Sequence, residues 1–223
     1  MLKYILISLF LFTLGTAGAQ TVTINKTEDK KDQNGLSLGI DISPFILYAF
    51  QPDRIGATFL GRYYFKRNWY SVAEVGFENV NFDSNSYEYI SNGGFLKIGV
   101  DYNFFKVNNP NNTDNITAGI RYGIATQSQQ SPRYTIIDDY WGDYTGEIGL
   151  STVVSHYIDL VAGIRTQVFK NFFMGWTFRL KVLMASSSKT VLEPYSIPGY
   201  GKGDVNVNMG FTYTLEYQIP FKK

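Results

Sequence analysis

Apolar and polar residues alternate along most of this chain. Successive side chains of a strand point to opposite faces, so a period of two predicts strands with one apolar and one polar face. The most regular stretch is Val205 to Ile219, where every odd position is apolar and every even one is Asn, Gly, Thr, Glu or Gln. In all, the pattern predicts eight strands: Leu36–Ser43, Arg54–Lys66, Trp69–Phe82, Phe95–Phe105, Asn115–Ala125, Ser151–Phe169, Phe172–Ala185 and Val205–Ile219. Pro44, which has no N–H for a ladder, marks a bulge or an end of the first strand, which could continue into Phe45–Phe50.

Charged residues occupy only the polar face of these strands. Among them are six acids and six bases: Asp41, Arg62, Glu74, Glu78, Lys97, Asp101, Arg121, Asp159, Arg165, Arg179, Lys181 and Glu216. The other face is almost continuously apolar, which reverses the rule for a soluble sheet, and an apolar outside around a polar inside indicates a barrel in lipid. The sequence therefore predicts an all-β fold, a closed eight-stranded antiparallel up-and-down transmembrane β-barrel.

The connections between these strands alternate in length. Two are tight, at 66–68 and 170–171, whereas three are long, at 83–94, 126–149 and 186–203. Bacterial barrels pair short periplasmic turns with longer outer loops. We therefore expect a bacterial outer-membrane protein with both termini in the periplasm.

The chain begins with a segment typical of export. Lys3 precedes an apolar run from Tyr4 to Leu14, and the small residues Ala17-Gly18-Ala19 follow. This predicts a signal peptide over 1–19, a flexible periplasmic lead over 20–35, and the barrel over 36–223. Removing Lys3 leaves 19 basic against 19 acidic residues, since the whole chain has 20 and 19. This balance excludes a nucleic-acid partner, and the lack of Cys excludes thiolate chemistry.

The inward charges have two interpretations. An eight-stranded barrel is just wide enough for side chains to fill, and equal numbers of opposite charges favour a paired, plugged interior. Nine glycines on the same face would make room for the long side chains. The alternative is an ion-selective channel or small transport barrel.

Other candidate sites are weaker. His156 lies near Ser151, Ser155 and Asp159, which suggests a rim hydrolase or acyltransferase, but His156 and Asp159 have opposite parity, so we expect no enzyme. The fifth connection combines acids and aromatics, and we expect these to pack on the barrel rim rather than to contact a ligand or partner: Asp138, Asp139, Tyr140, Trp141, Asp143 and Tyr144. No pattern indicates a metal or a cofactor.

The last strand resembles the signature by which outer-membrane assembly machinery recognises a final strand, through Asn208, Gly210, Tyr213 and Leu215. More widely, the chain resembles a Bacteroidota family of small outer-membrane barrels. The resemblance covers nearly the whole mature chain and rests on these runs: Gly61-Arg62-Tyr63-Tyr64-Phe65, Leu96-Lys97-Ile98-Gly99-Val100-Asp101-Tyr102-Asn103, Met174-Gly175-Trp176-Thr177-Phe178-Arg179-Leu180-Lys181, Pro198-Gly199-Tyr200-Gly201 and Tyr217-Gln218-Ile219-Pro220-Phe221. It implies an OmpA-type barrel without an appended peptidoglycan-binding domain, and supplies no catalytic residues.

Taken together, these patterns predict a non-enzymatic outer-membrane barrel that acts in envelope structure or binds a partner through its outer loops. The expected partners are outer-membrane lipid, the assembly machinery during insertion, and a membrane protein. The main alternative is a barrel subunit of a larger assembly or secretion complex.

Overall fold

The structure, a computed structural model, describes residues 35–66, 68–104, 114–137, 139–187 and 192–220. The predicted signal peptide and all of the predicted lead except Gly35 lie outside these ranges. Among the described residues, no helix is long and apolar enough to cross a membrane.

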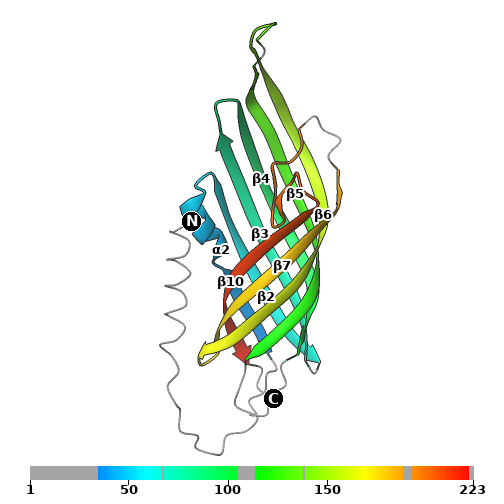
Figure 1. The fold of residues 1–223 in the computed structure, drawn as a ribbon. Helices are drawn as coiled ribbons and strands as arrows, with labels where there is room; N and C mark the ends of the chain where they lie inside the picture. The colour runs from blue at the N-terminus through cyan, green and yellow to red at the C-terminus, as the bar shows by residue number, and fades with distance from the viewer. Residues whose placement is uncertain (1–34, 67, 105–113, 138, 188–191, 221–223) are drawn as a thin grey trace, which may run out of the picture. The chain divides into compact units, whose positions relative to one another are not determined.

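Eight long strands close into one antiparallel barrel (Figure 1), which confirms the predicted fold class. They pair in the order β1-β10-β7-β6-β5-β4-β3-β2, and β1 closes the ring by pairing with both β2 and β10. Their bounds are Gly35–Asp41 for β1, Arg54–Lys66 for β2, Trp69–Asp83 for β3, Tyr87–Asn103 for β4, Asn115–Ile136 for β5, Tyr144–Phe169 for β6, Phe172–Ser186 for β7 and Val207–Pro220 for β10. Gly35 pairs with Pro220, so the described ends of the chain lie at the same rim as the tight turns that follow β2 and β6.

Two connections predicted as long loops are mostly strand. β3 and β4 remain paired as far as Asp83 and Glu88, and β5 and β6 as far as Ile136 and Tyr144. The predicted loop bounds of 83–94 and 126–149 were therefore wrong, because strand occupies most of both ranges. Beyond the apolar belt the outward residues become polar, as the inward ones are, so the alternation of apolar and polar residues disappears while the backbone ladder continues.

The first strand was also predicted too long. It ends at Asp41, and Ser43–Phe50 form the helix α2 instead of a strand continuation. Pro44 lies in the first helical turn, where its missing N–H leaves no intrahelical bond unmade. The Asp41 carboxylate accepts a hydrogen bond of 2.9 Å from the Ser43 N–H, which turns the chain out of the ladder.

The connection between β7 and β10 folds inward. It contains a small hairpin of β8 (Ser196–Ile197) and β9 (Gly201–Lys202). Ser196, Ile197 and Tyr200 are buried. We call its described residues, 192–203, the plug loop.

Candidate functional site

Nine of the twelve inward charges form one alternating series of ion pairs across the barrel. We call this series the charge chain. Five cations and four anions follow one another at 2.7 to 3.6 Å, apart from the close Arg121–Glu74 pair, in the order Arg165, Glu216, Arg62, Asp101, Arg121, Glu74, Arg179, Asp159 and Lys97. These residues come from every barrel strand except β1. All nine are buried, so each charge depends on its neighbours in place of water.

The other three predicted charges have separate roles. Asp41 accepts the hydrogen bond from Ser43 described above, and Glu78 pairs at 2.7 Å with Arg54, a cation that the parity argument did not include. Lys181 has no carboxylate within 4.0 Å in the described part of the chain. Its Nζ donates hydrogen bonds to the carbonyl oxygens of Gly199 (2.9 Å) and Tyr200 (3.0 Å).

The plug loop is held in the barrel by the polar wall. Lys97 donates to the Gly199 carbonyl at 2.9 Å, Tyr157 to the Pro198 carbonyl at 3.2 Å, and Ser196 to the Glu78 carboxylate at 2.7 Å. Ile197 and Tyr200 pack in a buried cluster with Phe95, Ala125 and Tyr157. The plug loop therefore closes one mouth of the barrel, and its own residues complete the buried core.

Tyr157 was missed as part of this arrangement, although it lies on the same parity as Asp159 and is fully buried. Extending the parity rule from charged to aromatic side chains would have placed it inside. The burial of Tyr200 could not be found in this way, because it lies in a loop that has no alternation.

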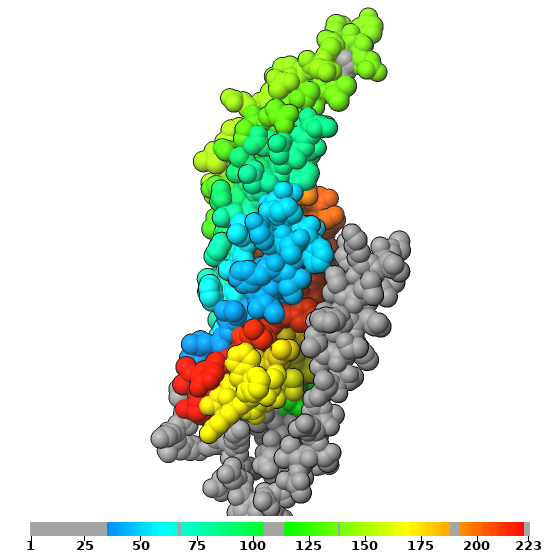
Figure 2. All heavy atoms as spheres, turned by 90° about the vertical axis from the view of Figure 1, so that its left-hand side faces the viewer, coloured from blue at the N-terminus to red at the C-terminus, as the bar shows by residue number. Residues whose placement is uncertain are grey.

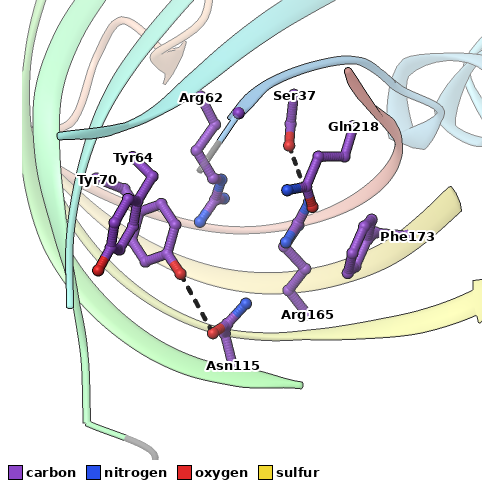
Figure 3. A pocket seen from close by; sticks show the side chains of 9 residues that line it. Ser37, Arg62, Tyr64, Tyr70, Asn115, Arg165, Phe173 and Gln218 are labelled. Carbon is purple, nitrogen blue, oxygen red and sulfur yellow. Dashed lines mark hydrogen bonds between the residues drawn. The ribbon is translucent and has the colours of Figure 1, made fainter. Parts of the chain in front are cut away.

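The opposite end of the barrel is closed by side chains (Figure 3). Arg165 donates at 2.8 Å to Glu216 and at 2.9 Å to Ser37, and its guanidinium lies 3.5 Å from the centre of the Phe173 ring. Tyr70 donates to Asn115 at 3.4 Å. The cavity among these residues is about 10 Å³, no more than the room for one water. A continuous aqueous path would have to displace this layer.

The structure does not assemble the rim catalytic triad that was weighed for His156. A hydrogen bond of 2.6 Å joins His156 Nδ1 to the Tyr122 hydroxyl, and Asp159 belongs to the charge chain. Ser155 shares a hydrogen bond of 3.1 Å with Ser186. Within the described residues, no hydrogen bond joins His156 to Ser151, Ser155 or Asp159, and no cluster of three or more His, Asp or Glu could hold a metal ion.

The acidic and aromatic residues of the fifth connection lie at the tip of the β5–β6 hairpin. Asp138 is outside the described residues, whereas Asp139, Asp143 and Tyr144 are exposed. Tyr140 and Trp141 are 83% and 84% exposed and pack edge to face, with ring centroids 4.9 Å apart. The expectation that these aromatics pack on the barrel rim was therefore wrong, because strand pairing carries the tip away from the rim.

Residues of the proposed assembly signal have structural contacts of their own. Asn208 donates at 2.8 Å to the Lys202 carbonyl of the plug loop, and the Tyr213 N–H donates at 2.8 Å to the Ser43 hydroxyl at the start of α2. Gly210 and Leu215 lie on the same strand, β10. Their part in recognition by the assembly machinery stays a prediction.

The described residues thus define a closed eight-stranded barrel whose interior charges are paired and whose one mouth holds an inward-folded loop. The chain belongs to the family described as a domain of unknown function, DUF6048, whose model matches residues 1–223. No curated protein matches it. Among solved structures, it is similar to Ail, the attachment invasion locus protein of Yersinia pestis, with 11% identity and a TM-score of 0.42 over 83% of this chain and 99% of that one. An origin in Bacteroidota stays a prediction.

Proposed function

We propose that this protein is a non-enzymatic, non-conducting outer-membrane barrel that presents its long β5–β6 hairpin to a partner at the cell surface. The observation that carries the proposal is the contrast between the two parts of the molecule. The charge chain crosses the lumen and the plug loop occupies one mouth of the barrel, whereas the hairpin tip offers exposed apolar side chains. We therefore assign the function of this protein to its outer surface.

An exposed apolar belt supports the membrane location. The outward residues of the strands remain solvent-accessible although they are large and apolar, among them Phe59, Ile98, Ile120, Leu160 and Phe211. The belt ends where outward residues become polar, as at Asn79 and Asn81 of β3 beyond Phe77. A continuous apolar surface of this kind needs lipid around it. The rim with the tight turns and both described chain ends then faces the periplasm.

The β5–β6 hairpin supports the partner-binding role. Its strands extend beyond the other strands of the barrel (Figure 1), past the end of the apolar belt. Yet Ile136, Ile137 and Tyr144 near its tip are 56 to 69% exposed, in addition to Tyr140 and Trp141. Exposed aromatic and aliphatic residues grouped on a water-facing surface indicate a contact site.

The tip can be tested by replacing Tyr140 and Trp141 together with Ser. Because both are exposed, we expect the barrel's unfolding stability to change by less than about 0.5 kcal/mol. Loss of two aromatic anchors should weaken partner binding by about tenfold or more. The measurement is cross-linking on intact cells followed by quantitative co-purification, with Leu150→Ser, lower on the same hairpin, as the matched control. Equal recovery of the same partner with the wild type and the double variant would refute a contact site at the tip.

The closed lumen can be tested by conductance. Wild-type protein in a planar lipid bilayer should show no steady open level, and Arg165→Ala should show none either, because the plug loop still occupies the other mouth. Arg165→Ala should instead lower the free energy of unfolding by about 3 kcal/mol or more, since a buried partner of Glu216 is lost. A large, steady conductance of the wild type would overturn the non-conducting barrel.

A further inference from the structure

The barrel wall has an opening on one side. β1 ends at Asp41, opposite Thr58 of β2 and Thr214 of β10. Beyond that level β2 continues through Arg54–Ala57 and β10 through Val207–Thr212. Within the described residues, these segments pair only with β3 and β7. Two strand edges therefore face each other across the place that a longer β1 would fill.

The helix α2 lies over this opening. The Ile42 N–H donates at 2.8 Å to the Tyr213 carbonyl, and the Ser43 hydroxyl accepts from the Tyr213 N–H, which fixes the start of the helix to β10. Figure 2 looks onto this face, with the atoms of α2 in blue. Phe45, Ile46, Leu47, Tyr48 and Phe50 are all 45 to 57% exposed, so the cover itself is apolar.

Behind the helix lies a cavity of about 540 Å³, within the roughly 300–1,000 Å³ of small-molecule sites. Its outer lining is apolar and includes Leu47, Met209 and Phe211, which belong to the lipid-facing surface. Its inner lining includes Glu74, Lys97 and Arg179 of the charge chain. One cavity thus joins the membrane side of the wall to the charged interior.

The charges that line this cavity do not balance. Five cations, Arg54, Lys97, Arg179, Lys181 and Lys202, face three acids, Asp41, Glu74 and Glu78. Lys181 is the cation best suited to bind a ligand. Its ammonium has three N–H donors, and within the described residues two of them are used by carbonyl groups of the plug loop. Lys181 lines the cavity together with Gly210, where a Cβ would be in van der Waals contact with Nζ at 3.7 Å. An anion could therefore reach Lys181 without displacing the plug loop.

We propose that this cavity binds an amphiphile with a single acyl chain and an anionic head group, a carboxylate or a phosphate, taken laterally from the outer leaflet. The acyl chain lies along Leu47, Met209 and Phe211 beneath α2, and the head group accepts a hydrogen bond from Lys181. Lateral entry explains why β1 stops short and why the opening is covered by an apolar helix. The inference rests on the proposed membrane location.

The test uses the purified full-length barrel in lipid nanodiscs and the fluorescent fatty acid cis-parinaric acid. Trp176 stacks on Phe211 with ring centroids 5.4 Å apart, so its emission should be transferred to a chain bound in the cavity. We expect saturable binding at one site. Oleate should displace the probe about tenfold better than methyl oleate, the range that one charge-assisted hydrogen bond provides. Displacement by oleoyl lysophosphatidate shows that a phosphate head group is accepted, and failure to displace restricts the site to carboxylates.

Three variants link this binding to the cavity. Lys181→Met removes the anchoring charge and should weaken the probe about tenfold. Thr58→Leu, which places a larger side chain in the cavity lining, should also weaken it, whereas Lys170→Met at the opposite rim should not. Each variant is first checked for folding by its heat-modifiable migration in gels. Non-saturable binding, or equal binding by wild type, Lys181→Met and Thr58→Leu, would overturn the site. Because heat-modifiable migration reports the folded barrel independently of ligand binding, that result would not count against the proposed membrane location.

Discussion

Glu74→Ala is expected to lower the free energy of unfolding by about 3–5 kcal/mol, as removal of one partner from a buried charge pair does. The Glu74 carboxylate is at the middle of the charge chain, where it pairs with Arg121 and accepts two hydrogen bonds of 2.8 Å from Arg179. Without Glu74 the charge chain keeps five cations but only three anions. Arg179 then relies on Asp159 at 3.5 Å and Arg121 on Asp101 at 3.0 Å. The measurement is urea unfolding of the refolded barrel in lipid vesicles, followed by tryptophan fluorescence.

Asp83→Ala is the matched control because it removes an acid of the same strand from an exposed ion pair. Asp83 and Arg133 are 2.8 Å apart, with side chains 68% and 43% exposed. An exposed pair contributes about 0–1 kcal/mol, so this variant should be nearly as stable as the wild type. The double variant Glu74→Ala, Arg121→Met restores the original excess of one cation and should recover part of the loss. If Glu74→Ala and Asp83→Ala were equally mild, the charge chain would not hold the interior together.

Gly199→Ala is expected to release the plug loop from the barrel. Gly199 has φ = +70°, and a Cβ there would lie 2.7 Å from both the Phe95 ring and the Tyr157 hydroxyl. A left-handed alanine costs about 1–2 kcal/mol and overpacking about 1–3 kcal/mol. The docked loop should therefore lose about 2–5 kcal/mol, a rise of roughly 30- to 4,000-fold in its open population.

The chain's lack of cysteine provides a direct measurement of this release. Ile197, 1% exposed, is replaced by Cys, and its labelling rate with a maleimide reports how often the loop opens. Gly199→Ala should raise that rate by the factor above. Gly142→Ala is the control, because Gly142 also has positive φ (+82°) but nothing within 4 Å of a Cβ. Slow labelling in both variants would show that the loop is not held at Gly199.

Periodicity was a good guide within the apolar belt and a poor one outside it. It placed β2 at Arg54–Lys66 without error, and it ended β7 one residue short of Ser186. It failed for the outer halves of β4 and β5, where residues such as Asn92 and Ser128 pair across the ladder, because polar residues occupy the outward face there as well as the buried inward face. It also failed after Pro44, because an apolar run without alternation fits a helix as well as a strand.

The inward charges illustrate the same division. Parity alone placed twelve of them on the polar face, but it could not show that nine of them form a single series. The pairs Arg179–Glu74 and Lys97–Asp159 join strands that are not neighbours in the ring. Such contacts depend on barrel diameter and strand stagger, which no single strand encodes.

The sequence by itself determined the strand count, the two faces and the antiparallel barrel, because a two-residue period and an apolar exterior are local properties of each strand. Only the tertiary structure decided how far the hairpins extend, where the wall is open, and that the loop with Pro198, Gly199 and Tyr200 fills the mouth. Those features arise from closure of the ring, which brings Lys97 and Lys181 to the same carbonyl, that of Gly199. Closure is a property of all eight strands together.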